Sequence, residues 1–163
     1  MLLAAVAQPS PKGWFCAGTY VFLAVFMPLL MLFWFMGQGQ VSDLDVTRRE
    51  ERHRPFIVAV CGAAAAWGGL YVIAAPSLLV QFAAAHTIVI GTVFGVTLYW
   101  KISVHAAGAA GVATLVTALV GVPAVVFLPV LLVAWSRLYL RRHTLSQVVA
   151  GGLLGAVVFA SLL

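Results

Sequence analysis

The apolar runs of this chain constrain its fold more than any other feature. A helix needs roughly 20 apolar residues to cross the hydrocarbon core of a bilayer. Six runs of about this length follow one another, separated by polar stretches or proline turns. Only 8% of the 163 residues are charged, whereas a soluble domain has about a quarter. The sequence therefore predicts an all-α, polytopic bundle of six transmembrane helices, folded as a single domain over residues 1–163.

The bounds of the six helices follow from the ends of the apolar runs and from the positions of prolines. Residues 1–13 lack the basic region and the full apolar core of a signal peptide, so we expect a short N-terminal tail. Pro28 is expected to kink the first helix. The predicted helices cover residues 14–37, 56–75, 78–100, 103–120, 124–140 and 145–163.

The charged residues gather in three loops that six crossings place on one face of the membrane. We name the first, second and third polar segments as residues 48–55, 101–105 and 136–147. Eight of the nine basic residues lie on this face, and only Lys12 lies on the other. The basic excess does not indicate nucleic acid, because the charges occupy short loops between apolar runs. The positive-inside rule predicts an integral cell-membrane protein with this face in the cytoplasm.

Several residues inside the apolar runs have an ordinary structural interpretation. Cys16 and Cys61 are expected to be buried thiols, since no disulfide or metal pattern is visible. His86, deep in the third helix, is expected to be neutral and bonded to a neighbouring helix. Three pairs of glycines predict close helix approach in lipid: Gly91 and Gly95, Gly108 and Gly111, Gly151 and Gly155.

The third polar segment places one imidazole in a cluster of fixed positive charge. Arg137 can bind phosphate oxygens in a bidentate fork, and His143 can act as a nucleophile or base. A positive-inside anchor explains Arg141 and Arg142 easily, but it explains His143 less well. Gln147 lies one helical turn after His143 and can reach the same face.

Gln147 has two interpretations that do not exclude each other. It can orient the ring of His143 from the next helical turn. Residues 144–147, Thr-Leu-Ser-Gln, also fit the capping-box pattern, in which Gln bonds back to the N-cap amide. Both interpretations stay open from the sequence.

The second polar segment begins the fourth predicted helix. Ser103 is a good N-cap, because its oxygen can accept from the free amides of the first turn. The helix N-terminus with Lys101 beside it favours an anion, and His105 lies near the same spot. The alternative is a capped helix with an interfacial Lys and His.

The first polar segment mixes charges of both signs. A solvated loop explains Arg49, Glu50 and Glu51. Arg54 differs, because it stands where the chain enters the membrane and is fixed there by Pro55.

These residues together resemble the three signatures of the type 2 phosphatidic acid phosphatase (PAP2) superfamily, in the same order and over nearly the whole chain. The third match is specific, and the joint occurrence of all three carries the resemblance. The first signature is a Lys followed, after six residues, by Arg-Pro, and Arg54-Pro55 matches its end. The second is usually Pro-Ser-Gly-His, which Ser103-Val104-His105 resembles. The third is matched by Ser136-Arg137 followed, after five residues, by His143.

The resemblance implies a membrane phosphatase that needs no metal and no other cofactor. His143 would attack phosphorus and form a phosphohistidine, oriented by Gln147. His105 would protonate the leaving alkoxide and later activate water. The equatorial phosphate oxygens would be neutralised by Arg54, Lys101, Ser103, Arg137 and, as a substitute, Arg48.

The substrate implied is a phosphate or diphosphate on a lipid carrier, either a polyprenyl (di)phosphate or a phosphatidate-type lipid. The expected partners are this lipid and the bilayer, with no nucleic acid, and the oligomeric state is left open. A carrier-recycling phosphatase would instead require the active face outside.

The sequence departs from the family pattern at three positions, and the departures at Thr47 and Gln147 favour a second hypothesis. Thr47 stands seven positions before Arg54, where the family has Lys, so Arg48 or Lys101 would replace that charge. Val104 replaces Gly. Gln147 replaces an Asp, so it can orient His143 but brings no charge. The alternative is a weakened or inactive relative that serves as a lipid-binding or structural membrane subunit.

Overall fold

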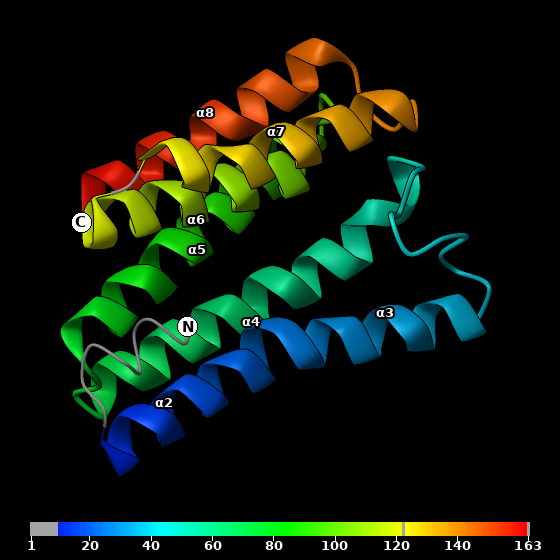
Figure 1. Ribbon diagram of the computed structural model, residues 1–163. Coiled ribbons are helices and arrows are strands. Elements are labelled where there is room, and N and C mark those ends of the chain that lie inside the picture. The colour runs from blue at the N-terminus through cyan, green and yellow to red at the C-terminus, as the bar shows by residue number, and fades with distance from the viewer. Residues whose placement is uncertain (1–9, 122, 163) are drawn as a thin grey trace. The chain divides into compact units, whose positions relative to one another are not determined.

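The computed structural model describes residues 10–121 and 123–162, and all the regular structure in these residues is helical. Within these residues six helical rods follow one another (Figure 1), so the predicted all-α, six-helix fold is confirmed. The elements are α2 (Pro11–Val21), η1 (Phe22–Phe26) and α3 (Met27–Gly37) in the first rod; η2 (Glu50–Arg52) with α4 (His53–Val72); α5 (Ser77–Thr97); α6 (Val104–Val120); α7 (Pro123–Tyr139); and α8 (Leu145–Leu162).

Four of the rods are long and apolar enough to cross a membrane, which is compatible with an integral membrane protein. They are Pro11–Gly37, Glu50–Val72, Ser77–Thr97 and Leu145–Leu162. Helix α6 and the Phe127–Tyr139 part of α7 are apolar but shorter.

The first rod begins at Pro11 rather than at residue 14. The Ser10 hydroxyl accepts from the Gly13 amide at 3.0 Å, and Pro11 occupies a first-turn position where its missing N–H costs nothing. The rest of the predicted tail, residues 1–9, lies outside the described residues.

Pro28 perturbs the first rod through a π-helical turn rather than through a simple break. Proline cannot donate to the carbonyl four residues earlier, and its ring crowds that carbonyl. Directly before it, η1 adopts π geometry, in which the Met27 amide donates to the Phe22 carbonyl. Gly62 on α4 lies against the neighbouring Leu23 carbonyl, where an added Cβ would collide with the oxygen.

The chain divides into two compact units, residues 1–90 and 91–163, and α5 contributes to both. In the first unit, α2, η1, α4 and the start of α5 share one apolar core. The Tyr20 hydroxyl bonds His86 Nδ1 at 2.7 Å, so the predicted interhelical bond of His86 is confirmed. The buried core residues are Cys16, Ala17, Tyr20, Ala24, Ala66, Leu70, Leu79 and Ala83.

The two cysteines differ in their surroundings. Cys16 is fully buried, as expected, but Cys61 is exposed. The expectation of a buried thiol was wrong for Cys61 because an apolar residue in a membrane-length helix does not have to face a neighbouring helix; it can equally lie on the outer face.

In the second unit, α6 and α8 run parallel in close contact. A Cβ added at Gly151 would collide with the Ser103 carbonyl, and one added at Gly155 would collide with the Ala107 carbonyl. One turn further on, a Cβ at Gly111 would come within 2.6 Å of the Phe159 ring. These contacts confirm the predicted close approach through Gly111, Gly151 and Gly155.

The other predicted glycine contacts are not found. A Cβ added at Gly91, Gly95 or Gly108 would meet nothing within 4 Å among the described residues. Small residues at this spacing permit close packing, but a contact forms only where the helix face that carries them lies against a neighbouring helix.

Candidate active site

The second and third polar segments meet at one end of the second unit. The Ser103 amide donates to the Gln147 carbonyl at 3.2 Å, which joins the start of α6 to the first turn of α8. Because α6 and α8 are parallel, their N-termini lie at the same end. The partial positive charges of both helix ends therefore converge there, which favours an anion.

Ser103 begins α6 as predicted. Its backbone is extended and its hydroxyl accepts from the Ala106 amide at 3.3 Å, so the N-cap is confirmed. Ser103 is completely buried, whereas His105, in the first turn, is exposed. The Ser103 hydroxyl thus accepts from one of the first-turn amides, which at any helix start have no carbonyl acceptor within their own helix.

Both bonds of the predicted capping box are present at the start of α8. The Gln147 amide donates to the Thr144 hydroxyl at 3.4 Å, and the Thr144 amide donates to Gln147 Oε1 at 3.1 Å. The box fixes the Gln147 side chain against the first turn of α8.

The same amide oxygen also bonds His143. Gln147 Oε1 lies 3.2 Å from His143 Nδ1, and His143 is buried. An amide oxygen can only accept, so Nδ1 must donate and the neutral ring must carry its lone pair on Nε2. The Thr144 amide fixes which end of the Gln147 amide is the oxygen. Gln147 therefore caps α8 and orients His143 at the same time.

The turn between α7 and α8 closes around the carbonyl of Arg137. This carbonyl accepts from the Arg142 amide at 3.0 Å and from the His143 amide at 3.3 Å. Arg141 takes a left-handed conformation with φ of +53°, the geometry that usually ends a helix at glycine. Lys101 Nζ donates to the Arg142 carbonyl at 2.8 Å. The turn thus holds together residues from both polar segments.

The first polar segment belongs to the other unit. Arg54 bonds the Gln40 side-chain oxygen. Arg48 has a side chain 73% exposed and lies 3.6 Å from Glu51. The structure brings together Lys101, Ser103, Arg137, His143 and Gln147 among the predicted site residues, and it does not place Arg48 or Arg54 relative to them.

The loop before α4 is more ordered by hydrogen bonds than a solvated loop would be. Glu51 Oε2 accepts from the Ser42 amide at 2.7 Å and from its hydroxyl at 2.8 Å, so the expectation of a merely solvated Glu51 was wrong. Arg52, only 3% exposed, donates through Nε to the Val46 carbonyl at 2.8 Å. No sequence signal separated Arg52 from its charged neighbours.

Thr47, seven positions before Arg54, is part of this loop. Its hydroxyl donates to the Asp43 carboxylate at 3.0 Å, and its amide lies 3.3 Å from the same oxygen. The sequence signal that could have predicted this bond is the spacing of four residues between Asp43 and Thr47, because Asp commonly bonds nearby backbone amides in turns. Thr47 thus has a local structural role here.

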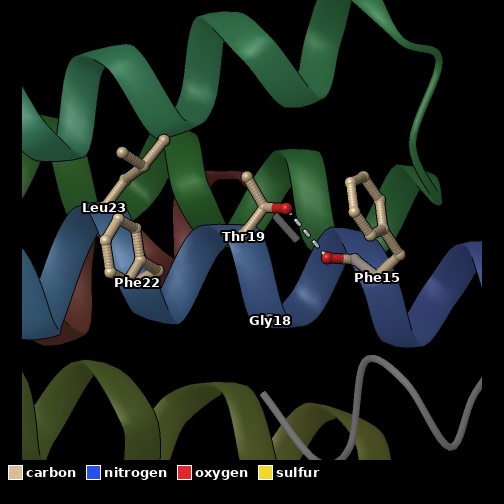
Figure 2. A pocket seen from close by; sticks show the side chains of 5 residues that line it. All are labelled: Phe15, Gly18, Thr19, Phe22 and Leu23. Carbon is tan, nitrogen blue, oxygen red and sulfur yellow. Dashed lines mark hydrogen bonds between the residues drawn. The ribbon is translucent and has the colours of Figure 1, made fainter.

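An open apolar groove on α2 and η1 contains none of the predicted site residues (Figure 2). It is lined by Phe15, Gly18, Thr19, Phe22 and Leu23. The only side-chain hydroxyl, that of Thr19, already donates to the Phe15 carbonyl at 3.0 Å. Within the described ranges, no three His, Cys, Asp or Glu side chains come together as metal ligands would.

Comparison with known proteins identifies one family. The model of the PAP2 superfamily matches residues 40–163, a range that includes all three polar segments and leaves out α2 and α3. No curated protein and no solved structure matches the chain.

Proposed function

Because this chain belongs to the PAP2 superfamily, we propose that it is a metal-independent membrane phosphatase that removes phosphate from a lipid through a phosphohistidine. Membership of the family indicates a phosphatase-type activity in general. The lipid substrate, the covalent intermediate and the roles of single residues are our proposal.

The single observation that carries this proposal is the bond between Gln147 Oε1 and His143 Nδ1. With Nδ1 donating, the lone pair of the neutral ring that could attack phosphorus is the one on Nε2. A buried imidazole held in one tautomer beside two helix N-termini is suited to nucleophilic attack on an anionic substrate.

The proposed reaction has two steps. Nε2 of His143 attacks phosphorus, the N–P bond forms and the P–O bond to the leaving group breaks. His105 donates its proton to the departing oxygen. Water then attacks the phosphohistidine while His105 accepts a proton, the N–P bond breaks, and inorganic phosphate leaves. Such phosphoryl transfer requires mainly positioning and charge stabilisation.

Charge on the phosphate oxygens is offset by groups of the second unit. The guanidinium of Arg137 supplies fixed positive charge, and the hydroxyl of Ser103 can donate although its oxygen also accepts from Ala106. Arg54 and Arg48 are proposed as further phosphate ligands from the family pattern alone.

The organisation of residues 1–163 as a single domain also stays a prediction.

The proposed substrate class is a polyprenyl (di)phosphate or a phosphatidate-type lipid. Membrane-length apolar helices support a substrate whose tail stays in the bilayer while its head group reaches the polar segments. The reaction releases inorganic phosphate and leaves an alcohol or a monophosphate in the membrane.

A second function, that of an inactive lipid-binding or structural relative, is favoured by two observations. Thr47 is bonded to Asp43 where the family has a phosphate-binding lysine, and Gln147 brings no carboxylate charge. The presence of both His105 and His143 argues against an inactive relative, since binding a phosphate requires cations rather than imidazoles.

Phosphate release by the purified protein in detergent with EDTA tests the proposal. Polyprenyl diphosphate, polyprenyl monophosphate and phosphatidate would be assayed in parallel. We expect turnover of at least one of them with EDTA present. Saturable lipid binding without turnover would instead support the inactive relative.

The location of the active face has its own test. We propose that the polar segments face the cytoplasm, since they carry the basic excess. Leu44, 54% exposed in the loop before α4, would be replaced by Cys in a chain whose Cys16 and Cys61 are removed. An impermeant thiol reagent should label Leu44→Cys only after the cells are opened. Labelling of intact cells would place this face outside.

A further inference from the structure

The peptide group that joins Arg142 to His143 is held at both of its polar ends. Its carbonyl oxygen accepts from Lys101 Nζ at 2.8 Å, and its N–H donates to the Arg137 carbonyl at 3.3 Å. Lys101 comes from the second polar segment, 41 residues earlier in the chain, and its side chain is partly buried. The backbone that carries His143 is therefore fixed by Lys101, in the connection before α6, and by Arg137, in the last turn of α7.

We infer that Lys101 is a positioning residue for His143, acting through this peptide group rather than primarily as a phosphate ligand. The inference rests on the proposed function. Rotation of the peptide group would turn the Cα–Cβ bond of His143 and carry the ring away from Gln147. The bond from Lys101 opposes that rotation from the backbone side, as Gln147 opposes it from the ring side.

The local geometry explains why such a bond is needed. Arg141, the residue before Arg142, has a positive φ, which non-glycine residues adopt only at a cost in free energy. A turn containing this strain keeps one conformation only when surrounding contacts fix it. A bond from an ammonium group is stronger than one between neutral partners, particularly where water is partly excluded.

The two roles of Lys101 predict different kinetics. A phosphate ligand stabilises bound phosphate directly, so its loss raises the inhibition constant of inorganic phosphate. A positioning residue leaves that constant almost unchanged and lowers kcat, because the substrate still binds while the nucleophile is misaligned.

The experiment compares Lys101→Met with Lys101→Arg and with a matched control, Lys12→Met. Lys12 Nζ also donates to a backbone carbonyl, that of Ala74, at 3.0 Å, but it lies in the other unit. For Lys101→Met we expect kcat to fall about 10-fold to 100-fold, as for partners that orient catalytic ligands. The inhibition constant of phosphate should change less than about threefold, which is under 1 kcal/mol.

The other variants complete the kinetic test. Lys101→Arg should recover part of the lost kcat, since it can still donate to the Arg142 carbonyl, and Lys12→Met should match the wild type. A rise in the phosphate inhibition constant that equals the loss of kcat for Lys101→Met would overturn the inference. Should Lys101→Met not fold, Lys101→Arg decides by the same comparison.

A second measurement does not depend on activity. Nitrogen NMR of ¹⁵N-histidine-labelled protein in detergent reports the tautomer of His143, assigned by comparison with His143→Gln. We expect a single Nδ1–H tautomer in the wild type and in Lys12→Met, and a mixture in Lys101→Met. An unchanged His143 signal in folded Lys101→Met would contradict the positioning role. Absence of turnover in the wild type with this NMR pattern intact would instead contradict the proposed function alone.

Discussion

The backbone amide of Ser103 donates to the backbone carbonyl of Gln147 at 3.2 Å. Ser103 caps α6 and Gln147 lies in the first turn of α8, so this bond holds the starts of two parallel helices at one level. His105 lies two residues after Ser103, and His143 lies four residues before Gln147. The bond therefore brings the predicted general acid and the predicted nucleophile to the same end of the second unit.

Substitution of Gly155 by Ala should destabilise the second unit. An added Cβ would collide with the Ala107 carbonyl, which is backbone and cannot move aside easily. We expect a loss of about 1–3 kcal/mol, as for other overpacked sites, measured as a lower Tm in detergent. Gly108→Ala, where nothing lies within 4 Å, is the control and should be neutral or stabilising. Equal effects of the two substitutions would show that α6 and α8 do not pack through Gly155.

Substitution of Arg141 by Gly should stabilise the turn before His143. Arg141 is exposed and has φ of +53°, so Gly relieves backbone strain, while the more flexible unfolded chain offsets part of the gain. We expect a net gain of up to about 1 kcal/mol in unfolding free energy. Arg141→Val should lower the unfolding free energy by at least the amount that Arg141→Gly raises it, because β-branched residues tolerate positive φ poorly. A lower Tm for Arg141→Gly than for Arg141→Val would contradict this account of the turn.

The parts of the fold that depend on local chemistry were predictable from the sequence. Apolar runs gave the six helices, and the side chains of Ser103 and Thr144 mark helix starts because their oxygens accept first-turn amides. The Gln147 contacts were also foreseen, since residues four apart share a helix face.

Contacts to backbone carbonyls were not predictable in the same way. Every residue has a carbonyl, so the bond from Lys101 to Arg142 and the bond from Arg52 to Val46 leave no mark in the sequence. The exposure of Cys61 was missed because composition alone does not give the rotation of a membrane helix. Pro28 signalled a disturbance but did not specify a π turn.

Substitution of Gln147 should affect both stability and rate. Gln147→Ala removes the capping bond, costing about 1 kcal/mol, and the bond to His143, costing about 10-fold to 100-fold in kcat. Gln147→Asp should keep or raise kcat, since a carboxylate accepts from the ring and stabilises its cation. Ser146→Ala, in the same turn, is the control. Phosphate release per folded molecule that is equal for Gln147→Ala and the wild type would leave Gln147 as a cap only.

Substitution of His105 by Ala should depend on the leaving group. A general acid matters most when the departing oxygen is a strong base, so loss of His105 should be small for aryl phosphates and large for alkyl phosphates. The measurement is kcat/KM across a series of leaving groups for wild type and His105→Ala. A uniform loss across the series would argue against proton donation by His105.

The most direct test of the central claim is to trap the phosphoryl group on His143. The wild type and His143→Ala would be mixed with a ³²P-labelled lipid phosphate. His105→Ala, used to slow the second step, would be mixed with a ³²P-labelled aryl phosphate, whose departure needs little proton donation. All would be quenched in alkali, where phosphohistidine survives. We predict acid-labile label on the wild type and on His105→Ala, and none on folded His143→Ala. Label of the same acid lability on His143→Ala, or phosphate release by that variant at the wild-type rate, would contradict the phosphohistidine mechanism.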